Sequence, residues 1–451
     1  MKLKAIAIAL SMATVSFAHA DMNSQLSSLQ AQVNQLQSQV SSMGSSSGSS
    51  MMSGVVGLNS ALSMQMMGNQ AGVGKELNLL TARQNGMNQM LTLGGYAQGD
   101  FVYDHASPAG NFINPQIEAT NTSSSGTAIV LTDASLSTTI AMGSWVTGYM
   151  QLGQSAIGGS LSTSFGVQDA YLVFGNLAQL PVYGFAGNKD IDFGSFQTTD
   201  IYNQPLTRTL FAAHGNTAGV GVNAYGFNGV VSAMNGGSES TTPVSVGSNY
   251  QYDNLATDSS GNINNFAVNL SYGMTTAGIS WNIGAGYLAG SSYLSNTTSG
   301  SHPNGETNGA WDLNAKVSAY GFDLLGEYVT TVSDTAISSA FGSAQRASAW
   351  DVGADYNFPV MGYNTTVNAD YSGASLGSGN NAKGNQYVIG YGVEAVKNVK
   401  VGVEYAYTTG VANYFGSGAA GVLPAGATVT TAAGSSTVKN STVALDVTAA
   451  F

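Results

Sequence analysis

From about Leu93 to the last residue, apolar and polar residues alternate with a period of two over many short segments. Residues 311–318 read WDLNAKVS, residues 350–357 read WDVGADYN, and residues 399–407 read VKVGVEYAY. Successive side chains of a β-strand point to opposite faces, so each segment predicts a strand with one apolar and one polar face. Strands of about 9–11 residues with this pattern are what a transmembrane β-barrel requires.

The pattern recurs often enough to predict about sixteen strands, joined by connections of alternating length. An even count, with short turns at one end and long loops at the other, is typical of bacterial outer-membrane barrels. This asymmetry places the first and the last strand so that both chain ends of the barrel lie on the periplasmic side. The predicted strands span residues 93–104, 129–142, 144–154, 166–175, 182–189, 217–225, 229–235, 264–272, 277–288, 310–319, 322–332, 348–358, 363–372, 386–396, 399–407 and 440–451.

The composition separates a membrane barrel from a soluble β-sandwich or β-solenoid, whose outward face should be charged. Charged residues are only 8% of this chain, against roughly 25% in ordinary globular proteins. They fall on the more polar face of the strands, whereas the other face carries Trp281, Trp311, Trp350 and many tyrosines. The sequence therefore predicts an all-β fold, a transmembrane antiparallel barrel over residues 93–451 surrounded by outer-membrane lipid.

The first twenty residues have the three parts of a secretory signal peptide. Lys2 and Lys4 precede an apolar run, and Ala18-His19-Ala20 forms an A-x-A cleavage site. The apolar run is too short for a membrane helix, which needs roughly 18 apolar residues. Residues 1–20 are therefore interpreted as a signal peptide, and the protein is expected in an outer membrane of the Gram-negative type.

The residues between the signal and the barrel divide into two predicted regions. Residues 21–43 carry a heptad seam, which is typical of a short α-helical coiled coil in the periplasm. One such helix cannot bury its own seam, so a homo-oligomer is favoured over a helix folded back on the barrel, with dimer and trimer both open. Residues 44–92 are interpreted as a flexible Ser/Gly/Met-rich linker, whose part 51–89 could pack in the barrel mouth or on the periplasmic rim.

Several functions are excluded or disfavoured by composition. The chain has no Cys, so it has no disulfides or thiolate ligands, and its net charge of −12 argues against a nucleic-acid partner. The histidines after the signal are far apart and show no metal-ligand spacing. Residues 373–377 fit the G-x-S-x-G nucleophile pattern but open a Gly/Ser/Asn loop without the helix that the motif needs. We expect no enzyme, no cofactor and no metal site.

The polar face of the strands would line the inside of the barrel. A ring of about sixteen strands is too wide for side chains to fill, so a water-filled passage is expected. Most of the predicted lumen charges are acidic, which would favour cations if they lie near the narrowest part. The lumen candidates are Asp133, Asp169, Lys189, Asp312, Lys316, Glu327, Asp351, Asp355, Asp370, Glu394, Lys400, Glu404 and Asp446.

The third long loop, after the predicted strand 182–189, mixes acids, one Arg, aromatic residues and a Pro. Porins commonly fold a loop at this place into the lumen. We therefore predict that the loop lines the constriction, although an exposed loop is an equal alternative. The constriction candidates are Asp190, Asp192, Asp200 and Arg208, together with Lys189 on the preceding strand.

Short motifs around this loop resemble the LbtU-type siderophore porin family. Residues 169–177 read DAYLVFGNL, followed by PVYG at 181–184 and GNK at 187–189. The continuations FGSF at 193–196 and QPLT at 204–207 are also similar to family segments, and the layout of signal, coiled coil and barrel covers essentially the whole chain. The family has Gly-Lys where this chain has Gly-Asn-Lys, so its lysine is displaced. The resemblance implies passive uptake of a ferric siderophore through an outer-membrane barrel without an energised plug.

The sequence thus predicts a porin-like channel for small solutes, with ferric siderophores as the narrower expectation. A surface adhesin or a structural barrel without transport is the alternative, because the long Ser/Thr/Asn/Gly loops are compatible with it. The terminal Phe451 on an alternating strand resembles the assembly signal of outer-membrane barrels.

Overall fold

The structure, a computed structural model, describes residues 56–67, 74–85, 87, 90–107, 124–155, 166–235, 263–291, 308–335, 343, 345–379, 382–410 and 439–451. The barrel belongs to the unit Leu58–Phe451. The predicted signal peptide and coiled coil lie outside the described residues. No helix in the described part of the chain is long and apolar enough to span a membrane.

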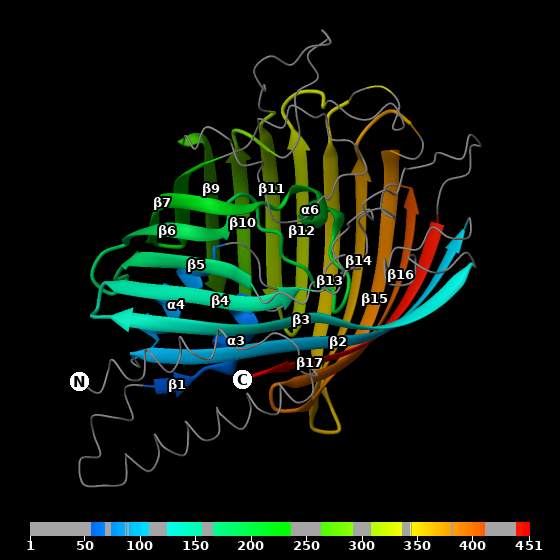
Figure 1. The fold of residues 1–451 in the computed structure, drawn as a ribbon, viewed down its shortest axis with the longest axis horizontal. Coiled ribbons are helices and arrows are strands. Elements are labelled where there is room, and N and C mark those ends of the chain that lie inside the picture. Colours follow the sequence, from blue (N-terminus) through cyan, green and yellow to red (C-terminus); the bar gives the residue numbers. More distant parts are fainter. Residues whose placement is uncertain are drawn as a thin grey trace. The chain divides into compact units, whose positions relative to one another are not determined.

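Sixteen antiparallel strands form a sheet that closes on itself, because the last strand pairs with the first strand of the ring (Figure 1). This confirms the predicted all-β barrel. A shorter strand, β1 (Val56–Leu58), lies at the boundary of this unit. The strands of the ring are β2 (Leu91–Ser107), β3 (Ser125–Met142), β4 (Val146–Ser155), β5 (Gly166–Gly175), β6 (Val182–Asp190), β7 (His214–Ala224), β8 (Phe227–Asn235), β9 (Ile263–Thr276), β10 (Ile279–Leu288), β11 (Ala310–Ala319), β12 (Phe322–Thr331), β13 (Ser348–Val360), β14 (Tyr363–Ser375), β15 (Lys383–Val396), β16 (Val399–Gly410) and β17 (Lys439–Ala450).

The short turns all join strands at one end of the ring. Four of them are two-residue turns with positive φ at both positions, at Tyr225-Gly226, Ala277-Gly278, Tyr320-Gly321 and Met361-Gly362. Such turns match the twist of a hairpin, and glycine adopts positive φ without steric cost. The predicted strands 264–272 and 277–288 imply a turn at 273–276, which was wrong. β9 continues to Thr276, because Gly278 and not Gly273 takes the positive φ.

The outside of the ring is apolar. On β10, Ile283 is 54% exposed on the outer face, while its neighbour Asn282 lines the inside. Aromatic rings lie near both ends of the outer face, as in the aromatic girdles of membrane barrels. Near the short turns the ring pairs are Tyr272–Trp281 and Phe322–Tyr356, and near the long loops they are Phe266–Tyr287, Trp311–Tyr328, Trp350–Tyr371, Tyr371–Tyr387 and Tyr387–Tyr407.

Two helices precede the barrel in the segment interpreted as a flexible linker. They are α3 (Ser60–Met67) and α4 (Lys75–Gln84), which is a correction of that interpretation for these residues. Leu79 and Leu80 are buried against lumen-facing side chains of β4 to β6, among them Tyr149 and Tyr171. The helices therefore pack on the inner wall of the barrel, which is one of the two locations considered for this part of the chain. The extents of the predicted domains remain a prediction.

The terminal residue completes the ring. The backbone N–H and C=O groups of Phe451 pair with those of Gly95 on β2, at 3.0 Å in each direction. The hydroxyl of Ser63 on α3 also donates to the Phe451 carbonyl oxygen, at 2.8 Å. The C-terminus thus joins the last strand, the first strand of the ring and the N-terminal helices.

The two faces of β10 give a direct test of which side contacts lipid. We expect Ile283→Lys to lower the free energy of unfolding by about 2–4 kcal/mol, because a lysine on the lipid face must enter hydrocarbon. Asn282→Lys, one residue away but facing the lumen, should change it little. Urea unfolding in lipid vesicles measures both variants. Equal losses for the two variants would contradict the assignment of the faces.

Candidate functional site in the barrel lumen

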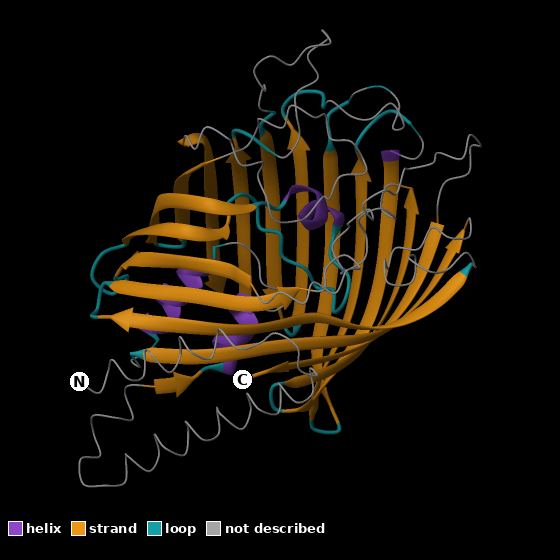
Figure 2. Ribbon diagram, in the orientation of Figure 1, coloured by secondary structure: helices purple, strands orange, loops and turns teal. Residues whose placement is uncertain are grey.

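Loop 3, the connection of residues 191–213 between β6 and β7, lies inside the ring of strands. Its apolar side chains Ile191, Phe193, Phe196 and Leu206 are almost fully buried in a cluster with lumen-facing residues of β8 to β14. The short helix α6 (Leu206–Phe211) packs on β12, β13 and β14 and is visible within the ring in Figures 1 and 2. Loop 3 therefore folds into the lumen as predicted, because its apolar residues are buried there against the inner wall.

Two glutamates of the wall bind the backbone of loop 3. Glu327 on β12 accepts hydrogen bonds from the N–H groups of Ser195 and Phe196, at 2.7 and 3.0 Å. Glu404 on β16 accepts from Ile201 at 2.6 Å, Tyr202 at 3.1 Å and Asn203 at 2.8 Å. Loop backbone that leaves water must find new partners for its N–H groups, and these carboxylates supply them. The two glutamates thus hold both halves of the loop across the lumen.

The wall on this side carries many buried acids, which we call the acidic belt. Each lies on the lumen face of its strand, and each is at most 6% exposed because loop 3 covers the wall. Among the described residues, none of these acids forms an ion pair. Asp200 of loop 3 joins this group. The acidic belt consists of Asp100, Asp312, Glu327, Asp351, Asp370, Glu404 and Asp446 on the strands, with Asp200 from the loop.

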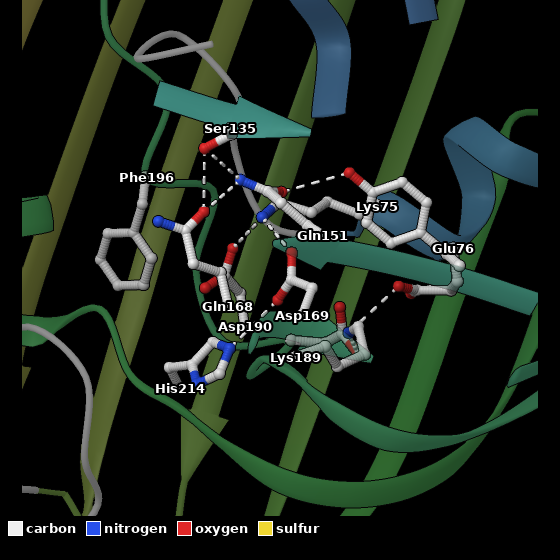
Figure 3. A network of polar contacts seen from close by, with 12 residues as sticks. Lys75, Glu76, Ser135, Gln151, Gln168, Asp169, Lys189, Asp190, Phe196 and His214 are labelled. Atoms are coloured by element: carbon white, nitrogen blue, oxygen red, sulfur yellow. Dashed lines mark hydrogen bonds and ion pairs between the residues drawn. The ribbon is translucent and has the colours of Figure 1, made fainter. Parts of the chain in front are cut away.

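The opposite wall is neutralised by α4. Lys75 forms ion pairs with Asp169 on β5 and Asp190 on β6, at 2.9 and 2.8 Å, and His214 contacts the other oxygen of Asp169 at 3.0 Å. Figure 3 shows these side chains converging from the helix and from the neighbouring strands. Burial opposes the charge of Lys75, but the two aspartates more than offset it and raise the pKa of Lys75 well above its usual value. Helix α4 is therefore anchored to the wall by charge.

Lys189 connects α4 with loop 3. Its ammonium group lies 3.1 Å from Glu76 on α4 and 2.7 Å from Asp192 at the start of the loop. All three side chains are almost fully buried. Burial and the neighbouring Glu76 raise the pKa of Asp192 to about 7, although Lys189 acts in the opposite direction. One lysine thus binds the N-terminal helix and the loop at the same point.

Asp169, Asp190 and His214 also satisfy the geometry of a metal site. One ligand atom from each lies within 4.8 Å of the others, and this is the only such group in the described part of the chain. The Lys75 ammonium group already contacts both carboxylates, so the cluster has a cation of its own. The arrangement is therefore that of an ion-pair network.

The five constriction candidates divide into two groups. Lys189, Asp190 and Asp192 belong to the network with α4, and Asp200 lies on the far side among the acids of the belt. Arg208 on α6 donates to the carbonyl oxygen of Phe196, at 3.3 Å, and so supports the loop from within. Their role in a constriction remains a prediction.

Burial raises the pKa of Asp200 well above its usual value, and the negative charges of Asp370, Glu404 and Asp351 raise it further. An acid at this position is disfavoured as an anion unless a positive charge approaches it. The environment of Asp200 therefore differs from that of Asp190, which faces Lys75.

The lumen candidates from the sequence also lie on the inner wall, at different depths. Asp169, Glu327 and Asp370 are buried, whereas Lys316 and Asp355 are more exposed near the short turns. Lys316 lies 3.8 Å from Asp323 with its side chain 39% exposed. A recess of about 60 Å³ lies between loop 3 and β10 to β12, lined by Ser195, Gln197, Asn282, Asn314, Ala315, Lys316, Leu325, Gly326 and Glu327.

Three residues that matter in the lumen, Lys75, Glu76 and Asp100, were not among the predicted candidates. Lys75 and Glu76 lie in the Met-rich segment, where no clear periodicity showed that a helix would face the lumen. Asp100 lies on β2, where the alternation itself placed it on the polar face but the residue was overlooked. Only the alternation on β2 offered a usable signal.

Comparison with known proteins places the fold. No protein-family model matches the chain, and no curated protein matches it significantly. OprB of Pseudomonas putida, in a structure at high pH, is 9% identical with a TM-score of 0.50 over 79% of this chain and 94% of that chain. An anion-selective porin from Comamonas acidovorans is 12% identical over 80% and 99% of the two chains, with a TM-score of 0.48. OmpF of Salmonella typhi in complex with daunomycin is 13% identical over 80% and 97%, with a TM-score of 0.47. The chain has the sixteen-stranded fold of outer-membrane porins.

The role of Lys189 can be tested by removing its charge. Lys189→Met leaves Glu76 and Asp192 buried without a counter-ion, and we expect a loss of about 3–5 kcal/mol in the free energy of unfolding. We also expect higher single-channel conductance, because α4 and loop 3 lose their common anchor. Urea unfolding in vesicles and planar-bilayer recording measure the two effects.

The matched control is Lys316→Met, which removes the same charge from an exposed pair. Its loss should stay below about 1 kcal/mol. If the two variants lost the same free energy and conducted equally, Lys189 would not anchor the helix and the loop.

Proposed function

We propose that this chain is an outer-membrane channel through which small polar solutes diffuse, with a preference for cations. The closed ring with an apolar outer face supports insertion in lipid, because every strand finds a partner and no edge remains. The observation that carries the proposal is the acidic belt, which lies on the inner wall behind loop 3, whereas the acids near α4 are already paired with lysines. Rings of acidic side chains favour cations in pores.

An adhesin or a purely structural barrel is the alternative. Neither function needs buried charge on the inner wall or a loop held across the lumen by two glutamates. Stepwise ohmic currents in a planar bilayer would favour the channel, and their absence in correctly folded protein would favour the alternative.

Ion selectivity tests the contribution of loop 3. At a pH high enough to ionise both acids, whose pKa values are raised by burial, Asp192→Asn/Asp200→Asn removes two negative charges from the loop. The reversal potential in a KCl gradient should then move toward zero because cation preference falls. Asp334→Asn removes a charge from an exposed residue in the connection after β12 and serves as the control. A double variant with unchanged reversal potential would remove the two loop acids from the selectivity mechanism.

Ferric siderophores are the narrower candidate solute, and the motifs at 169–177 and 193–207 that resemble the LbtU-type family support them. The acidic belt would favour neutral or cationic ferric complexes over anionic ones. We expect cells without the protein to lose uptake of a radiolabelled neutral or cationic ferric siderophore and to regain it on complementation. Unchanged uptake would leave a general channel.

Homo-oligomerisation through residues 21–43 also remains a proposal, with dimer and trimer both open. The heptad seam supports it, because a single amphipathic helix leaves its apolar stripe exposed.

A further inference from the structure

The centre of the acidic belt contains carboxylate oxygens without a hydrogen-bond partner. Both side-chain oxygens of Asp370 and one oxygen each of Asp200 and Asp351 are buried without such a partner among the described residues. These three residues are at most 4% exposed. A buried polar atom without a partner is costly, and an ion or water is one of the few explanations for it.

The three acids lie on one patch of the lumen wall. Asp351 on β13 pairs with Ser372 of β14, so Asp370, two residues from Ser372, is its diagonal neighbour on the same face. Loop 3 brings Asp200 against them, and the Asn368 amide nitrogen on β14 donates to Asp200 at 3.4 Å. The amide oxygen of Asn368 is also buried without a partner. The patch therefore offers three carboxylates and one neutral oxygen.

The centre has fewer donors than the two glutamates of the belt: the Thr207 hydroxyl donates to one oxygen of Asp351, and Asn368 donates to one oxygen of Asp200. Glu404 accepts three backbone N–H groups, and Glu327 accepts two. On the opposite wall, Lys75 and Lys189 supply positive charge to buried acids. Asp370 has neither a donor nor an ion pair in the described part of the chain.

We propose that Asp200, Asp351 and Asp370, with Asn368, bind a divalent cation of the Mg²⁺ or Ca²⁺ class between loop 3 and the wall. Carboxylate and amide oxygens are the ligands that these hard cations prefer. The ion holds loop 3 to β13 and β14, in addition to the hydrogen bonds from Thr207 to Asp351 and from Asn368 to Asp200.

The spacing of the acids indicates how the ion is held. Their oxygens do not gather within 4.8 Å of one another, as those of Asp169, Asp190 and His214 do. A cation that keeps part of its water shell can be bound through one or two carboxylates and reach the others through water, which is the usual mode for Mg²⁺. We therefore expect a weak, hydrated site rather than a closed cage.

Protonation is the competing way to remove the charge of this patch. Each proton taken up by one of the three acids would lower the negative charge of the patch by one without a metal. Binding of a divalent cation must displace such a proton, so it releases protons to the buffer, and the metal binds more tightly as the pH rises. Proton release therefore distinguishes the two situations.

Mn²⁺ is a suitable probe, since it prefers the same oxygen ligands and its free form is detected by electron paramagnetic resonance. The folded full-length protein in detergent should bind Mn²⁺, and added Mg²⁺ or Ca²⁺ should displace it. Calorimetry in two buffers of different ionisation enthalpy should show proton release. This measurement involves no transport, so its failure would leave the proposed channel function untouched.

Two isosteric variants locate the ion. Asp370→Asn should weaken Mn²⁺ binding by roughly tenfold or more, because the charge of the ligand set governs affinity. Asp355→Asn removes the same charge from the same inner face, four residues along β13 from Asp351, and should leave the affinity within about twofold. Asp200→Asn, on the loop, provides a second test should Asp370→Asn fail to fold. Absence of Mn²⁺ binding to the unmodified protein, or equal affinity in all variants, would overturn the proposal.

Discussion

The whole structure depends on the closure of one hydrogen-bonded ring. A strand that faces hydrocarbon cannot leave its N–H and C=O groups unpaired, so the sheet must return to its first strand. β17 does this by pairing with β2 over its full length, and Phe451 extends the pairing to Gly95. Closure then creates an inside that is too wide for wall side chains alone to fill. Loop 3 and the helices α3 and α4 fill part of that space.

These inner elements are held by different chemistry on the two sides. Helix α4 carries its own lysine to the aspartates of β5 and β6, so charge is matched to charge. Loop 3 brings backbone N–H groups to Glu327 and Glu404, so acids are matched by dipoles. Dipoles do not cancel a net charge, so the ionised acids of the belt keep a negative charge that lysines neutralise on the opposite wall. The electrostatic field across the lumen is therefore asymmetric.

The period of two made the barrel predictable from the sequence. On β11 and β13, the residues predicted to face inward, such as Asp312 and Asp351, are buried behind loop 3, and their apolar neighbours Leu313 and Val352 are exposed outside. The inward path of loop 3 was also predictable from its aromatic residues and its position. The ends of the strands were harder to predict from the sequence. For the turn at Ala277-Gly278, for example, either Gly273 or Gly278 could have formed it.

The sequence could not predict which lumen residues form hydrogen bonds and ion pairs with one another. Glu327 lies more than a hundred positions from Ser195 in the chain, and Lys75 lies 94 positions from Asp169, so no local pattern connects them. Helix α4 has only a weak apolar face, since its burial depends on a wall that exists only once the ring has closed. Its residues acquire their role from the barrel, which is why the same segment reads as a linker when considered alone. The sites in the lumen therefore form only when the ring closes. Some acids of the described part of the chain receive no hydrogen bond from the N-terminal helices or loop 3. An ion or a polar solute could still bind to them.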